Sequence, residues 1–208
     1  MMLDYRVYLV AQTNACAPGC LLATVEAAVQ GGVTLVQLRE KDAVTGEFVA
    51  VALKLKALLD QYSVPLLIND RIDVALACDA QGVHLGQDDM PLALARRILG
   101  PDRIIGISAG TVTEALAAQA GGADYLGVGA VYATPTKTDA GAPLGPEGLK
   151  AITSAVDIPV VAIGGMKAHN AALMRRNGAD GVAVVSGIMA AADPLRAASE
   201  IKQGWERA

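Results

Sequence analysis

The sequence predicts an α/β protein, a single-domain (β/α)8 barrel that spans residues 1–208. Three observations favour this fold. Short apolar runs alternate with longer segments of helical period, which is typical of parallel strands covered by helices. Eight such strand-like runs occur, and no Pro- or Ser-rich linker divides them. A chain of 208 residues is also long enough for one barrel of this kind.

The strand-like runs belong to two groups. Four contain or follow glycines suited to the left-handed position that ends a helix. Their segments are 31–38, 82–86, 121–129 and 178–186. The other four are apolar runs without such a glycine, at residues 6–10, 64–68, 103–107 and 158–163. In chain order the two groups predict eight strands.

Helical signals fill the intervals between the strands. In residues 46–62, apolar side chains recur every three or four positions, which predicts one buried helix face. Thr111 and Glu114 have the spacing of a capping box at a helix start. Asp193 precedes Pro194, which suits a cap followed by the first helical residue.

An open, doubly wound sheet is the alternative architecture for alternating strands and helices. That fold binds dinucleotides through a Gly-x-Gly-x-x-Gly turn after its first strand. Here the first strand leads into Gln12-Thr13-Asn14 instead. The barrel is therefore favoured.

Composition argues against a nucleic-acid partner. The chain has 17 Lys and Arg against 21 Asp and Glu, a net charge of −4. Binding to a phosphate backbone requires a broad basic surface, which this balance does not provide. With five Tyr, one Trp and one Phe, aromatic side chains for base stacking are also scarce. We expect no nucleic acid to bind.

The sequence also predicts a cytoplasmic protein without a membrane partner. No run of eighteen apolar residues occurs, and Asp4 lies where a secretory leader would be basic. Cys16, Cys20 and Cys78 are odd in number and lack zinc-finger spacing, so we expect reduced structural thiols. His84 lies inside a predicted strand, where a hydrogen-bonded structural histidine is expected rather than a base.

Two acids follow neighbouring strands of the predicted barrel. Functional side chains of such barrels lie at the carboxyl ends of the strands, where Asp70 and Asp89 can converge on one point with Asn69 nearby. Oxygen ligands alone favour Mg²⁺, which shares its coordination with waters and phosphate oxygens. The alternative is that both acids are exposed loop or cap residues.

Cations from two other strands point to the same region. Arg39 and Lys41 follow the second strand, and Lys137 comes from the loop after the sixth. Together with a hard metal, three cations suit a diphosphate, because charge-assisted bonds to phosphate oxygens are strong. Taken singly, each would be an ordinary solvated surface charge.

A second anion site is predicted after the last two strands. Gly164-Gly165 and Val185-Ser186-Gly187 lie where barrels bind a phosphate through backbone N–H groups. The alternative is a pair of tight turns, since glycine is a common turn residue. A diphosphate held with Mg²⁺ is a leaving group, and a monophosphate is a handle. The pattern therefore predicts a transferase that uses two small phosphorylated substrates and releases pyrophosphate.

The loop between the sixth strand and the next helix, residues 130–145, is long for its position. It is rich in Thr, Gly, Pro and Ala, as expected of a lid that closes over reactants. Plain surface disorder is the competing interpretation.

At these positions the chain resembles the thiamin phosphate synthase family. The matching motifs occur in order along nearly the whole chain: Gln37-Leu38-Arg39-Glu40-Lys41, Asn69-Asp70-Arg71, residues 82–89, Gly106-Ile107-Ser108, Gly127-Val128-Gly129, Thr134-Pro135-Thr136-Lys137, Ile163-Gly164-Gly165 and Val185-Ser186. Each motif is weak alone, but the ordered set is specific. The resemblance implies a (β/α)8 barrel that joins 4-amino-2-methyl-5-hydroxymethylpyrimidine diphosphate to a thiazole phosphate.

The resemblance also implies a role for each matching residue. The pyrimidine diphosphate would contact Gln37, Arg39, Lys41, Asn69, Ser108 and Lys137. The thiazole phosphate would contact Thr134, Thr136, Gly165, Val185 and Ser186. Asp70 and Asp89 would hold Mg²⁺. In two respects the chain departs from the family: Ala109-Gly110 replaces a more polar pair, and the first strand begins without the leading helix of many members.

Three other functions remain as alternatives. A thiazole phosphate isomerase or tautomerase of the same fold would keep the second phosphate site but need neither the acids nor the cations. A sugar-phosphate epimerase or aldolase would carry a proton-shuttling pair or a lysine inside a strand. A phosphate-ligand sensor would bind without turnover. The sequence does not specify the oligomeric state, which thiazole tautomer is used or the order of binding.

Overall fold

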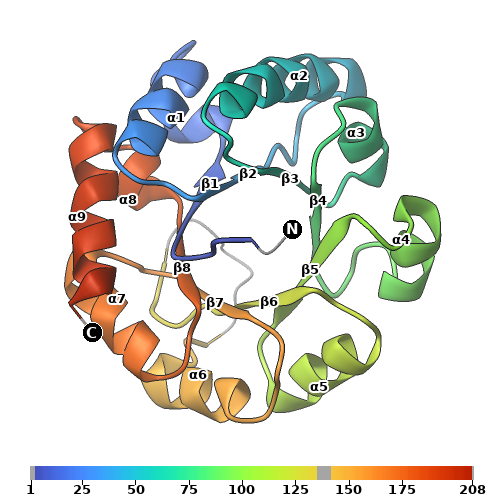
Figure 1. The fold of residues 1–208 in the computed structure, drawn as a ribbon, viewed down its shortest axis with the longest axis vertical. Coiled ribbons are helices and arrows are strands. Elements are labelled where there is room, and N and C mark those ends of the chain that lie inside the picture. The colour runs from blue at the N-terminus through green and yellow to red at the C-terminus, as the bar shows by residue number, and fades with distance from the viewer. Residues whose placement is uncertain (1–2, 135–141, 208) are drawn as a thin grey trace.

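A computed structural model describes residues 3–134 and 142–207. Eight parallel strands of these residues form one closed barrel, in which each strand pairs with its neighbours in chain order and the last pairs with the first. Figure 1 looks down the barrel and shows the helices as an outer ring around it. The predicted barrel and its eight strands are therefore confirmed.

The strands are short and evenly spaced along the chain. They are β1 (Val7–Ala11), β2 (Leu35–Leu38), β3 (Leu66–Asn69), β4 (Gly82–Leu85), β5 (Ile104–Ala109), β6 (Tyr125–Val128), β7 (Val160–Ile163) and β8 (Gly181–Val184). The helices are α1 (Leu21–Gln30), α2 (Thr45–Gln61), α3 (Ile72–Ala77), α4 (Leu92–Leu99), α5 (Val112–Ala120), α6 (Gly145–Thr153), α7 (Ala168–Arg176), α8 (Ser186–Met189) and α9 (Pro194–Glu206), with a short 3₁₀ helix at Thr13–Ala15.

The helix predicted at residues 46–62 is α2. Its buried side chains are Phe48, Ala52, Leu55 and Leu59, which recur at three- and four-residue spacing and face the barrel. Because burial of apolar area stabilises by roughly 25 cal/mol per Å², this face fixes the helix against the sheet.

The predicted helix caps are present, with one difference. Thr111 Oγ1 accepts a hydrogen bond from Glu114 N, and Asp193 Oδ1 accepts one from Arg196 N. In a full capping box, the Glu114 carboxylate would accept from the N–H of the cap residue itself. It accepts from Gly110 N instead, at 2.6 Å, and so restrains the end of β5.

One of the glycines expected to end a helix has another role. Gly32, Gly122 and Gly178 follow helices with positive φ angles of 108°, 86° and 86°, as predicted. Gly82 is instead the first residue of β4, where a Cβ atom would overlap the backbone of Ile104 on the neighbouring strand. Glycine is required here because β4 and β5 approach each other closely, and not because of its backbone conformation.

The segment before β1 closes the amino-terminal end of the barrel. Leu3 and Tyr5 are buried there, and the Tyr5 ring lies 4.9 Å from the Tyr125 ring between centroids. Figure 1 shows this segment crossing the middle of the barrel. A few apolar residues therefore seal the floor.

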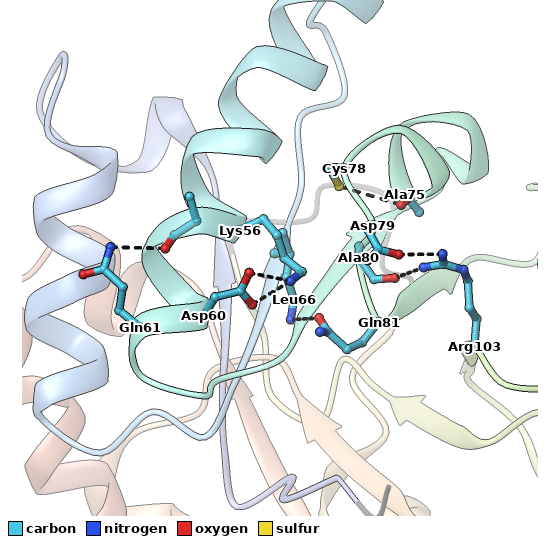
Figure 2. A network of polar contacts seen from close by, with 11 residues as sticks. Lys56, Asp60, Gln61, Leu66, Ala75, Cys78, Asp79, Ala80, Gln81 and Arg103 are labelled. Atoms are coloured by element: carbon cyan, nitrogen blue, oxygen red, sulfur yellow. Dashed lines mark hydrogen bonds and ion pairs between the residues drawn. The ribbon is translucent and has the colours of Figure 1, made fainter.

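A polar network links the same ends of β3, β4 and β5, as Figure 2 shows. Arg103 donates to Asp79 Oδ1 at 2.8 Å and to the Ala80 carbonyl, and Gln81 Oε1 accepts from Leu66 N at 2.8 Å. Asp79, Gln81 and Arg103 line a small pocket there and already have hydrogen-bond partners, so we assign this network a structural role.

Within the described part of the chain, no helix is both long and apolar enough to cross a bilayer. The three cysteines are free thiols, of which Cys78 is buried.

Candidate active site

A cavity of ≈ 830 Å³ opens at the carboxyl ends of the strands. Its lining comes from all eight strands and the loops that follow them, because parallel strands bring all their carboxyl ends to one rim. Residues far apart in the chain therefore meet in a single site.

The described residues predicted to bind the pyrimidine diphosphate all line this cavity. They are Gln37, Arg39, Lys41, Asn69 and Ser108. Gln37 and Asn69 are inward-facing strand residues and are 4% and 7% exposed, so their amides are held deep in the barrel mouth. Lys137 lies outside the described residues.

The two predicted metal acids lie next to each other. Asp70 lines the cavity and lies 3.2 Å from Lys41, measured from Oδ2 to Nζ. Asp89 lies beside it, where its Oδ2 accepts a hydrogen bond from Gly86 N at 2.6 Å. The Asp70 backbone has a φ of +61° and donates its N–H to the His84 carbonyl, which fixes the turn that aims the carboxylate.

Proximity displaces the pKa values of these two acids in opposite directions. Burial raises the pKa of Asp70, and the hydrogen bond and charge of Asp89 raise it further, against the Lys41 ammonium. Burial alone would raise the pKa of Asp89, but the hydrogen bonds from Asp70 and from Gly86 N, together with the Lys41 charge, lower it. Two carboxylates this close repel unless a proton or a cation lies between them.

This pair fits a hard divalent cation. Both donors are carboxylates, and their mutual repulsion would be relieved by a metal ion. In residues 3–134 and 142–207, no cluster of three or more His, Cys, Asp or Glu side chains forms a metal site. Two carboxylates are compatible with an ion such as Mg²⁺, which takes few protein ligands and completes its shell with water and phosphate oxygens.

The predicted thiazole phosphate residues border the same cavity on its other side. They are Thr134, Gly165, Val185 and Ser186, while Thr136 lies outside the described residues. Gly164 and Gly165 have φ angles of +99° and +67°, a conformation that other residues rarely adopt.

The turn after β7 is held by a buried amide that the sequence analysis did not single out. Asn170 Oδ1 accepts from Lys167 N at 2.8 Å, and its Nδ2 donates to the Gly165 carbonyl at 3.0 Å. The side chain is 9% exposed. It therefore fixes the orientation of the peptide groups that would face a phosphate.

His84 has the hydrogen-bonded place that was predicted for it. Its Nδ1 lies 2.9 Å from Tyr125 Oη, and its Nε2 lies 2.9 Å from Ser108 Oγ. Its ring also reaches the cavity lining.

Besides Asn170, sequence reasoning gave no role in the site to four residues. Gln87 donates to the Ser108 carbonyl at 2.6 Å, and Glu114 restrains Gly110 as described above. Tyr8 and Tyr125 line the floor of the cavity. Polar-tipped side chains inside otherwise apolar strands were the available signal for the two tyrosines.

Comparison with known proteins shows the family of this chain. The family model described as thiamine monophosphate synthase matches residues 7–188. The chain is 51% identical to the thiamine-phosphate synthase of Chloroflexus aurantiacus, over 97% of this chain and 93% of that one. It is 53% identical to the enzyme of the same name from Clostridium acetobutylicum, over 90% and 89%. A solved thiamine phosphate pyrophosphorylase from Pyrococcus furiosus superimposes with a TM-score of 0.89 at 40% identity, over 98% and 96%.

Proposed function

The chain belongs to the thiamine monophosphate synthase family and is a transferase that forms thiamin phosphate, and we propose that it does so by a dissociative coupling assisted by Mg²⁺. One observation carries the proposal: the Asp70 carboxylate with its Lys41 partner, the Arg39 side chain and the glycine turn after β7 border one cavity. The charged groups suit a departing diphosphate, and the glycine turn suits the phosphate of an incoming thiazole.

In the first step, the bond between the pyrimidine methylene carbon and the diphosphate oxygen breaks. Its electron pair leaves with pyrophosphate, and the ring amino group donates electrons into the pyrimidinylmethyl cation that forms. Arg39 and Lys41 bind the departing oxygens. Asp70 and Asp89 would hold Mg²⁺, and the bound ion would supply positive charge to the leaving group. Preorganised charges of this kind lower a barrier because they are already oriented when charge develops.

In the second step, the thiazole nitrogen donates its lone pair to the methylene carbon and forms the new C–N bond. Gly165, Val185 and Ser186 bind the thiazole phosphate and so orient the nitrogen. No protein base is required, because no proton leaves the thiazole nitrogen. The contribution of the protein is orientation and exclusion of water, the competing nucleophile.

Lys137 and Thr136 complete the two phosphate sites in this proposal, on the strength of the family resemblance. The remaining expectations also stand as part of it: cytoplasmic location, and no nucleic-acid or membrane partner.

The test is a coupled product assay. The purified chain is mixed with both precursors and Mg²⁺, and pyrophosphate and thiamin phosphate are measured. We expect equal amounts of the two products. Conversion of the thiazole phosphate alone would favour the isomerase, and binding of both ligands without products would favour the sensor. Either result would overturn the proposal.

A further inference from the structure

A continuous hydrogen-bond chain crosses the barrel below the cavity. Gln37 Nε2 donates to Tyr8 Oη at 2.6 Å, and Tyr8 Oη lies 2.9 Å from Tyr125 Oη. Tyr125 Oη lies 2.9 Å from His84 Nδ1, and His84 Nε2 lies 2.9 Å from Ser108 Oγ. The chain thus joins Gln37 on β2 to Ser108 on β5.

Two glycines inside the barrel leave space for this series of hydrogen-bonded side chains. A Cβ atom at Gly106 would overlap the Tyr125 ring, and one at Gly127 would lie 2.8 Å from His84 Cε1. Both tyrosines are buried, with exposed fractions of 2% for Tyr8 and 0% for Tyr125. In such surroundings a hydroxyl proton without an acceptor is costly.

Because the five groups are linked and the tyrosines are buried, their hydrogen bonds must all donate in the same direction. Since the Gln37 amide donates to Tyr8, the Tyr8 hydroxyl proton must go to Tyr125. The Tyr125 proton must then go to His84 Nδ1, which leaves the proton of a neutral imidazole on Nε2 to donate to Ser108 Oγ. Reversing any link requires the others to reverse, or leaves a buried donor unsatisfied.

Of the two ends of this hydrogen-bond chain, one offers the cavity an acceptor and the other a donor. In the described part of the structure, Gln37 Oε1 takes part in no hydrogen bond, and no polar side-chain atom is both buried and unpartnered. The Gln37 oxygen is therefore an accessible acceptor in the cavity that Gln37 lines. Ser108 Oγ accepts from His84, so its own proton is available to a ligand.

We propose that Tyr8 and Tyr125 are positioning residues that couple Gln37 to Ser108, so that the site presents one acceptor and one donor and selects a 4-aminopyrimidine over its 4-oxo analogue. This inference rests on the proposed function, in which Gln37 and Ser108 contact the pyrimidine. A 4-aminopyrimidine donates only through its amino group and accepts only at its ring nitrogens. The 4-oxo analogue has a carbonyl acceptor in place of the amino donor and carries an N–H on the ring.

Inhibition constants of two unreactive probes test the coupling. The probes are the pyrimidine monophosphate and its 4-oxo counterpart, each measured as a competitor of the pyrimidine diphosphate. Tyr125→Phe keeps the buried ring but divides the chain into two halves, each free to reorient. We expect the preference of the wild-type protein for the amino probe to fall by about tenfold or more, the scale of one mispaired buried hydrogen bond.

Tyr5→Phe is the matched control. Its ring packs on Tyr125, but its hydroxyl is not a link of the chain, so the probe ratio should stay at the wild-type value. A ratio that falls equally in both variants would assign Tyr125 a merely structural role and overturn the proposal. The KM for the thiazole phosphate should stay unchanged in Tyr125→Phe. Tyr8→Phe breaks the neighbouring link and replaces Tyr125→Phe if that protein does not fold.

Two further variants separate this inference from the proposed function. Gln37→Ala and Ser108→Ala should each weaken binding of the amino probe. If neither does, the pyrimidine lies elsewhere, and both the placement and the coupling are wrong. If both do while Tyr125→Phe and Tyr8→Phe keep the wild-type probe ratio, the coupling alone is overturned.

Discussion

Asp70 contacts both a cation and a second acid of the site. It has the Lys41 ammonium at 3.2 Å on one side and the Asp89 carboxyl on the other. In the proposed mechanism it holds the metal that takes leaving-group charge, so Asp70→Ala should reduce kcat by about two orders of magnitude or more. Asp73→Ala is the control, since that acid pairs with Arg71 on the surface of α3. Steady-state rates check this, and a variant at the wild-type rate would remove Asp70 from the mechanism.

Ser186 tests the other half of the cavity. It follows β8, lines the site, and is proposed to bind the thiazole phosphate. A hydrogen bond to a charged group contributes roughly 1.5–3 kcal/mol, so Ser186→Ala should raise the KM for the thiazole phosphate roughly ten- to a hundredfold. The KM for the pyrimidine diphosphate should change little. Ser154→Ala, an exposed position at the end of α6, should affect neither constant. An unchanged thiazole phosphate KM in Ser186→Ala would place that substrate elsewhere.

At the scale of the element, β5 has a glycine where the neighbouring strand β6 places the Tyr125 ring. Gly106 faces the barrel interior, and an added Cβ would overlap the Tyr125 ring, which is fully buried. Overpacking of this kind costs about 1–3 kcal/mol, so Gly106→Ala should lower the free energy of unfolding by that amount. Gly46→Ala provides the comparison, because an added Cβ meets nothing within 4 Å in the first turn of α2. Urea denaturation of both variants measures the difference, and equal midpoints would contradict the packing argument.

Individual elements show what local sequence can and cannot predict. The apolar period of residues 46–62 was sufficient to place α2 within one residue at each end, because burial of one face depends on spacing alone. Gly82 was predicted to end a helix, yet glycine is required there because the backbone of Ile104 on the next strand leaves no room for a Cβ atom. The link between Tyr8 and Tyr125 joins residues 117 apart, and no local pattern contains it.

For the whole molecule, chain order alone predicted where the site would form. Once the strands are known to be parallel and in sequence, their carboxyl ends must meet, so Arg39, Asp70 and Ser186 were expected at one rim and do line one cavity there. Motif order indicated which residues to look for. The local contacts of each residue could not be predicted in this way: Asp89 is not among the residues that line the cavity, and its carboxylate accepts a hydrogen bond from Gly86 N.

Because one closed barrel carries every part of this rim, a ligand bound there should stabilise the entire fold. A ligand present at a hundred times its dissociation constant contributes about 2.7 kcal/mol, which for a domain of this length corresponds to a rise in Tm of roughly 5–10 °C. Pyrophosphate and Mg²⁺ added together should produce this rise, and either alone much less, since each completes the binding site of the other. Thermal unfolding followed by circular dichroism measures it, with Asp70→Asn expected to abolish the joint effect. Shifts that simply add would show that the metal and the diphosphate bind at separate sites.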